Sequence, residues 1–212
     1  MNSDFTNYNA NVYHESRPSY PLELIETIKE YAPKFREINS IEIGAGTGKF
    51  SKLLLREGFK NLTCIEPNNN MLNYLEASGG YRLINCSCEN IPIENESFDL
   101  FFFAQSLHWF CNLKAREEIE RLSKPNSKYF VVWNELFTNK NKSTEQFKYI
   151  LQSSLSTEKR IIHDYPQEYY ITKMFDCNSY IKHKYIHSQD LTFSGLFNRY
   201  LSLSMSHGLS KN

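Results

Sequence analysis

Short apolar runs of strand length alternate along this sequence with segments whose apolar residues recur at helical spacing. This alternation is typical of a parallel sheet covered by helices, because each parallel strand is joined to the next by a crossover. We therefore predict an α/β fold, doubly wound, with a mostly parallel sheet and helices on both faces. Strands are expected at 40–43, 61–65, 81–85, 98–104 and 129–133, and helices at 21–32, 49–57, 68–78 and 113–122.

The run 98–104 is the most apolar part of the chain, so we predict a central strand that is buried on both faces. Pro125 and Asn126 predict a turn before the strand at 129–133. Beyond residue 134 the alternation weakens. There we expect a helical stretch within 142–170 and one more strand at 180–187.

The size and charge of the chain restrict its organisation and partners. With 212 residues and a mass of 25.0 kDa, it fits a single domain, which we divide into an arm and helix at 1–38, a core at 39–134 and a variable segment at 135–212. A net charge of +0 provides no field to attract nucleic acid. No run approaches the ~18 apolar residues of a membrane span, so we expect a cytoplasmic protein without a membrane partner.

The cysteines predict neither disulfides nor a metal site. Their number, five, is odd, and several lie in or beside apolar runs where buried thiols are common. Cys86 and Cys88 are separated by one residue and have no second Cys or His pair at zinc spacing.

A glycine turn, Glu42-Ile43-Gly44-Ala45-Gly46-Thr47-Gly48, lies directly between a predicted strand and a predicted helix. Glycine adopts backbone angles that other residues reach only at a cost, and it lets a ligand touch the main chain. The free N–H groups at the start of the helix suit a carboxylate or a phosphate. The turn therefore predicts a ligand but does not by itself identify it.

Three other interpretations of the turn are available. A phosphate-binding P-loop would need glycine at Ile43 and Ser or Thr at Phe50, so it fails at both positions. A dinucleotide fingerprint starting at Gly44 would need its third glycine at Lys49, which weakens this interpretation without excluding it. A purely structural turn is the third alternative.

Glu66 ends the second predicted strand and lies 20 residues after Gly46. This spacing is expected when an acid at the tip of the neighbouring strand reaches the hydroxyls of a ribose. A carboxylate only accepts hydrogen bonds and can bind both hydroxyls together. We therefore predict a ligand that contains a nucleoside.

Several segments together resemble the class I methyltransferases, specifically the type 11 methyltransferase domain and its branch of trans-aconitate methyltransferase-like proteins. An upstream segment is similar to the N-terminal arm of that branch, which folds over the cofactor. The resemblance is carried by 42–48, by 64–67 with Met71, by 88–92 with 97–99, by 104–110, and in the arm by Tyr13 with 17–21.

The resemblance implies a methyltransferase that uses S-adenosyl-L-methionine. By position it places the glycine turn against the methionine part of the cofactor, the acid on the ribose, and later residues around the adenine and the amino-acid group. The implied cofactor-binding residues are Arg17, Glu42, Gly44, Ala45, Gly46, Thr47, Glu66, Pro67, Met71, Cys88, Glu89, Ala104 and Gln105.

Two departures from that family stand out. Cys88 occupies a position where the family more often has alanine. The family also ends its sheet with an antiparallel hairpin of two strands, whereas this chain offers one candidate strand, at 180–187. We therefore expect an incomplete C-terminal hairpin.

The methyl acceptor is expected to be a small molecule, and the resemblance suggests a carboxylate. Methyl transfer is an in-line displacement on an activated group, so the protein mainly has to orient the reactants and needs no metal. If the acceptor is a hydroxyl or an amine, His108 is the best placed general base; otherwise it lines the pocket with Trp109. Tyr13 and Tyr20, together with Tyr8, are predicted to close over the pocket.

Two other functions remain open from the sequence. One is an oxidoreductase with an NAD-type nucleotide cofactor, which Lys49 disfavours. The other is a protein that binds S-adenosylmethionine without catalysis, which the short C-terminal part allows.

Overall fold

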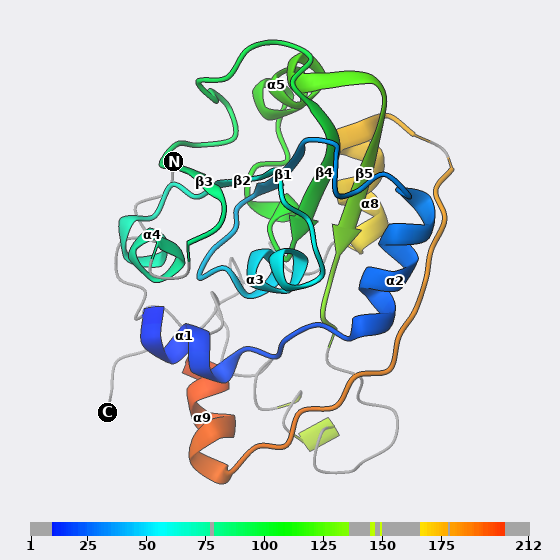
Figure 1. Cartoon of the computed structure of the whole chain (residues 1–212). Coiled ribbons are helices and arrows are strands. Elements are labelled where there is room, and N and C mark those ends of the chain that lie inside the picture. Colours follow the sequence, from blue (N-terminus) through cyan, green and yellow to red (C-terminus); the bar gives the residue numbers. More distant parts are fainter. Residues whose placement is uncertain are drawn as a thin grey trace.

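A parallel sheet forms the centre of the computed structural model (Figure 1), which describes residues 10–76, 79–135, 145–146, 149, 166–177 and 179–201. Its five strands lie in the order β3-β2-β1-β4-β5, and every neighbouring pair is parallel. The chain winds outward from β1 to β3 and then returns to β4 on the other side, which confirms the predicted doubly wound fold. The strands are β1 (Ser40–Ile43), β2 (Leu62–Ile65), β3 (Arg82–Ile84), β4 (Phe98–Ala104) and β5 (Ser123–Val132).

Helices cover both faces of this sheet. α2 and α3 pack on one face, and α5 and α8 pack on the other, each over its own cluster of buried apolar side chains. α1 and α9 lie side by side beyond the carboxyl ends of the strands (Figure 1). The helices are α1 (Ala10–Ser16), α2 (Leu22–Tyr31), α3 (Lys49–Arg56), α4 (Asn69–Glu76), the 3-10 turn η2 (Leu107–Trp109), α5 (Leu113–Leu122), α8 (Gln167–Phe175) and α9 (Phe193–Leu201).

The central strand β4 is buried on both faces, as predicted. Leu100 and Phe102 belong to the cluster under α2 and α3, while Phe101 and Phe103 belong to the cluster under α5 and α8. Successive side chains of a strand point to opposite faces, so this continuous apolar run serves two cores at once.

Strand β5 begins earlier than predicted, at Ser123 rather than at residue 129. Phe98 pairs with Ser123, but Leu100 pairs with Lys128, so extra residues of β5 bulge out between the two pairs. Asn126 lies in this bulge with a φ of 68°. The turn expected at Pro125 and Asn126 is therefore a bulge within β5. An edge strand tolerates proline at such a position.

The strand predicted at 180–187 was wrong. This segment has neither helix nor strand and runs from α8 along α2 towards α9 (Figure 1). Tyr185 Oη donates to Thr27 Oγ1 at 2.6 Å, and His183 Nε2 lies 3.2 Å from Tyr31 Oη. Side chains of α2 thus provide the contacts that a neighbouring strand would otherwise supply.

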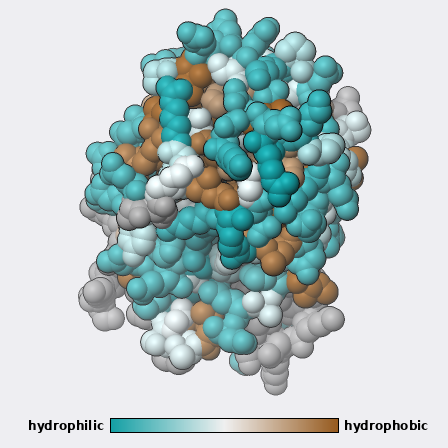
Figure 2. Space-filling model, viewed as in Figure 1, coloured by the Kyte–Doolittle hydropathy of each residue, from teal (hydrophilic) through white to brown (hydrophobic). Residues whose placement is uncertain are grey.

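No strand follows β5 in the described part of the chain; the expected incomplete C-terminal hairpin also concerns residues outside that part and stays a prediction. Of the helical stretch expected within 142–170, the structure describes helical residues at 145–146 and 149 and the first half of α8; the remainder lies outside the described residues, as does Tyr8. None of the helices described is long and apolar enough to cross a membrane. Figure 2 shows mostly hydrophilic residues on one face, with apolar residues in small areas.

Candidate functional site

The glycine turn leaves β1 at the carboxyl edge of the sheet and leads directly into α3. The N–H groups of Gly44 and Ala45 both donate to the carbonyl of Ile65, at 2.9 and 3.0 Å, and so attach the turn to the end of β2. Gly48 then donates to the carbonyl of Ala45 at 3.0 Å and begins the helix. In open α/β sheets, ligands bind at this edge, beside the point where the strand order reverses.

The three glycines are needed for different reasons, although all have positive φ angles of 75°, 58° and 79°. A Cβ on Gly44 would lie 2.6 Å from the Cβ of Ser106, and one on Gly48 would clash with Leu75 Cδ1. Apart from Gly46 itself and its two neighbours in the chain, no described residue has a heavy atom within 4 Å of a Cβ built on Gly46. Gly44 and Gly48 therefore permit close packing, whereas Gly46 borders open space that a ligand can enter.

The carboxylate of Glu66 joins the tip of β2 to this open position. Its Oε2 accepts from Gly46 N at 2.8 Å, and its Oε1 accepts from Asn68 N at 2.9 Å. The residue is only 7% exposed, and burial raises its pKa although the bonds from Asn68 and Gly46 oppose the rise. Since a carboxylate oxygen has two acceptor sites, each can still accept a hydroxyl from a ligand.

Glu42 lies beneath the turn and is 1% exposed. Ser51 Oγ donates to its carboxylate, and Cys64 Sγ lies 3.3 Å from the same hydroxyl. Burial raises the pKa of Glu42 to about 8, the hydrogen bond from Ser51 opposes the rise, and the negative charge of Glu66 adds to it. Glu42 is therefore largely protonated at neutral pH and links β1 to α3 below the open space.

The exit of β4 lies against the glycine turn. Ser106 Oγ donates to the carbonyl of Ile43 at 2.6 Å, which ties the end of β4 to the end of β1. Gln105, at a φ of 58°, donates its N–H to Val132 O at 2.9 Å and its side-chain Nε2 to Asn134 O at 3.2 Å. The predicted residues Ala104 and Gln105 thus lie at the same edge as the turn.

The residues predicted around the adenine are divided between two places. Met71 is buried on α4, next to the exposed Pro67 that follows β2. Cys88 is buried in the cluster under α5, where burial raises the pKa of its thiol well above the usual range. Glu89 Oε1 accepts from Asn112 Nδ2 at 3.0 Å, so this side chain contacts the N-cap of α5.

The arm contributes both predicted tyrosines and Arg17. The Arg17 guanidinium lies 4.9 Å from the ring of Tyr13, and Tyr20 packs edge-on against Phe50 of α3 at 5.0 Å. Burial raises the pKa of the Tyr20 hydroxyl well above its usual range, and Tyr13 and Glu42 contribute to the rise. Tyr20 is therefore part of the core beside Glu42 as well as part of the arm.

Arg199 of α9 joins the arm and was not predicted. Its Nη1 donates to Gln189 Oε1 at 2.8 Å and to the carbonyl of Ser16 at 3.5 Å. Burial, together with the positive charge of Arg17, lowers the pKa of Arg199 to about 10. No sequence signal marks this residue, because α9 meets α1 only through the tertiary fold.

His108 lies in an aromatic group after β4. Its ring is 4.7 Å from the ring of Trp109 and 6.1 Å from that of Tyr170 on α8. His108 is half-buried, whereas Trp109 is 42% exposed. These contacts test neither predicted role of His108, as a general base or in a pocket wall, and both stay predictions.

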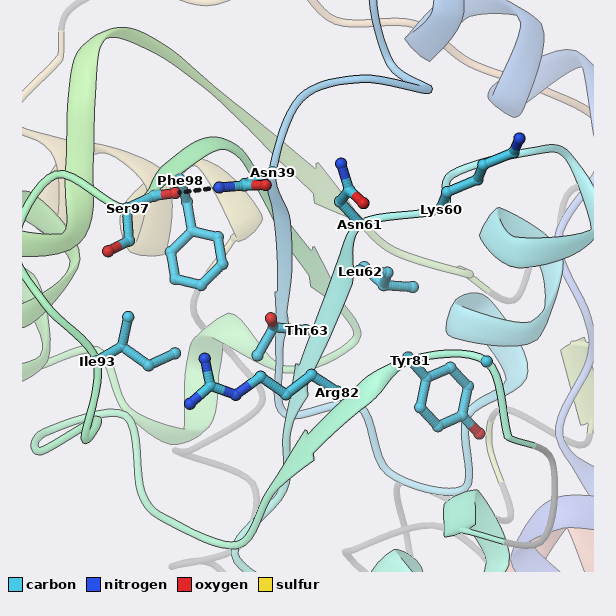
Figure 3. Close-up of a pocket in the computed structure, with 11 residues that line it drawn as sticks. Asn39, Lys60, Asn61, Leu62, Thr63, Tyr81, Arg82, Ile93, Ser97 and Phe98 are labelled. Atoms are coloured by element: carbon cyan, nitrogen blue, oxygen red, sulfur yellow. Dashed lines mark hydrogen bonds between the residues drawn. The ribbon is translucent and has the colours of Figure 1, made fainter.

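A separate cavity of about 480 Å³ lies at the opposite, amino edge of the sheet (Figure 3). Asn39, whose Nδ2 donates to Ser97 O at 3.1 Å, forms one side, and Arg82 reaches towards Ile93 across it. The charged side chains of its lining are Lys60 and Arg82. It holds no acid to accept hydroxyls, so the carboxyl edge remains the candidate site.

The strand order, the glycine turn after β1 and the acid at the tip of β2 define the class I methyltransferase fold. Solved structures with this fold support the assignment. A S-adenosylmethionine-dependent methyltransferase of Aquifex aeolicus matches with a TM-score of 0.52 and 20% identity, over 71% of this chain and 90% of its own. A structure from Methanococcus maripaludis matches with a TM-score of 0.55 and 19% identity, over 77% of this chain and 85% of its own.

Residues 41–131 match the family described as a methyltransferase domain. An uncharacterised methyltransferase-like protein of Schizosaccharomyces pombe is 35% identical over 125 residues, which cover 58% of this chain and 48% of that protein. An uncharacterised methyltransferase of Mycobacterium tuberculosis is 31% identical over 123 residues, covering 58% and 49%. The matched part of the chain spans about half the length of these relatives.

Proposed function

We propose that this chain binds S-adenosylmethionine at the glycine turn and transfers its methyl group to a small molecule. The observation that carries the proposal is the open space at Gly46 beside the buried carboxylate of Glu66. The match of residues 41–131 to a methyltransferase domain supports the same cofactor.

The residues present fit this cofactor. Glu66 has one free acceptor site on each oxygen for the two ribose hydroxyls. The carbonyls of Ala104 and Gln105 would accept from the ammonium group, and Arg17 would pair with the carboxylate of the amino-acid part. Pro67 and Met71 would pack near the adenine, and Cys88 and Glu89, whose side chains are buried or bonded to α5, would meet its edge through the backbone.

When bound, the cofactor supplies a methyl group that its own positive charge already activates. The chain then has to orient the acceptor and exclude water. Correct orientation of two reactants lowers a barrier by ~7–11 kcal/mol, so positioning alone provides much of the catalysis. Tyr13 and Tyr20 are the arm residues that we assign to closing the site.

We further propose a small carboxylate as the acceptor, in keeping with the resemblance to the trans-aconitate methyltransferase-like branch. With Arg17 assigned to the carboxylate of the cofactor, Arg199 supplies a second positive charge close to it, where α1 meets α9, and we assign Arg199 to the acceptor. A carboxylate is already deprotonated at neutral pH and needs a cation more than a base. His108 would act as a base only for a hydroxyl or amine acceptor.

Isothermal titration with S-adenosylhomocysteine and, separately, with NAD tests the cofactor. We expect binding of the first alone, and a loss of about 10- to 100-fold in affinity for Glu66→Gln, because a charged acceptor of two hydroxyls becomes neutral. Glu94→Gln makes the same chemical change at an exposed acid and should leave affinity unaltered. Binding of NAD alone would overturn the proposal.

A further inference from the structure

One side chain of the arm, His14 on α1, contacts the glycine turn directly. Its Nδ1 lies 3.0 Å from Oγ1 of Thr47, the residue that follows Gly46. Its ring also stacks on Tyr74 of α4, with 4.8 Å between ring centres and 30° between ring planes. His14 therefore joins α1, the turn and α4 next to the open space at Gly46.

The charged surroundings of His14 favour its neutral form. Burial, then Lys49 and Lys52 of α3, lower the pKa of His14 below its usual value of 6.5. Other titratable groups near α1 are Tyr13 and Glu15 on the helix itself and Tyr74 and Glu76 on α4. Among the described side chains of α9, Arg199 binds the end of α1 through Ser16. A proton on the imidazole would bring a third positive charge beside two lysines.

We propose that His14 is a positioning residue whose neutral imidazole holds α1 over the glycine turn, so that its protonation releases the arm and weakens cofactor binding. The inference rests on the proposed function, because it takes S-adenosylmethionine as the ligand beside the turn. His14 acts through Thr47 and the arm, and it takes no part in the methyl transfer itself.

The direction of the pH effect follows from linkage. The released arm exposes His14 to water, where its pKa is close to 6.5, whereas the packed arm lowers that pKa. The packed arm is therefore fully favoured above pH 6.5 and loses its advantage as the pH falls from 6.5 through the lowered pKa. Over that interval, affinity for the cofactor should fall by up to ~10-fold per pH unit.

Titration calorimetry with S-adenosylhomocysteine between pH 5 and pH 8 tests this inference on the full chain. The comparison is between the wild type and His14→Gln, whose amide can still bond to Thr47 but does not titrate. We expect the affinity of the wild type to fall more steeply below pH 6.5 than that of the variant. Glu42 and Glu66 are present in both proteins, so their titration cancels in the comparison.

Hydrogen exchange of the α1 amides gives a second measurement that needs no ligand. After correction for the intrinsic pH dependence of exchange, the hydrogen-bonded amides at 14–17 should lose protection at pH 5.5 in the wild type but keep it in His14→Gln. Identical pH profiles in the two proteins would overturn the role of His14. Absence of binding at every pH, with the exchange difference intact, would instead contradict the proposed cofactor.

Discussion

Alanine at Gly44 should mainly reduce stability and alanine at Gly46 should mainly reduce ligand affinity, although the two positions are two residues apart in one turn. Both residues have positive φ, which costs an alanine ~1–2 kcal/mol of folding free energy. At Gly44 the new Cβ would also lie 2.6 Å from the Cβ of Ser106, which is held by its bond to Ile43 O. Overpacking of this kind adds ~1–3 kcal/mol.

The expected losses of unfolding free energy are therefore ~2–5 kcal/mol for Gly44→Ala and ~1–2 kcal/mol for Gly46→Ala. Urea denaturation followed by circular dichroism measures both. Affinity for S-adenosylhomocysteine should fall more in Gly46→Ala than in Gly44→Ala, because the new methyl group at residue 46 projects into the space that the ligand is proposed to enter. Gly46→Ala should bind at least ~10-fold more weakly while it remains folded.

Two results would refute this reasoning. Equal destabilisation by both substitutions would mean that Ser106 does not restrict the turn as the structure indicates. Unchanged affinity in folded Gly46→Ala would mean that the ligand does not approach the main chain at Gly46.

Two further predictions concern stability. Because burial raises the pKa of Glu42 to about 8, the unfolding free energy of the wild type should fall as the pH rises from about 4.5 to 8. Urea titrations of Glu42→Gln should lack this pH dependence. Equal pH dependence in the two proteins would contradict a buried, protonated Glu42. Tyr185→Phe removes the hydrogen bond to Thr27 and should lower the free energy of unfolding by ~0.5–1.5 kcal/mol, measured by thermal unfolding. Hydrogen exchange in α2 should become faster. An unchanged exchange rate would argue against this contact.

The pattern of apolar residues predicted most of the sheet because strand and helix periodicities are local properties. β1 and β4 have the predicted bounds, and the run of phenylalanines in β4 is buried on both faces as expected. The same reasoning gave a wrong prediction at 180–187, where the structure has no strand. Its aromatic and β-branched residues favour a strand, but the partner available to them was the side of α2.

For the site, the spacing between Gly46 and Glu66 indicated that a turn and an acid would meet, since both follow neighbouring parallel strands. The structure adds that they meet directly, through the bond from Gly46 N to Glu66 Oε2. His14 and Arg199 carried no signal in the sequence. Their roles depend on α1 and α9 coming together from opposite ends of the chain.

The sequence by itself determined the alternating elements, the turn and the acid, because each depends on the chemistry of a few neighbouring residues and on a short spacing. Only the tertiary structure decided which glycine borders open space, since Ser106 and Leu75, from distant segments, fill the space beside Gly44 and Gly48. Packing between remote parts of the chain sets these contacts, and no local pattern records them.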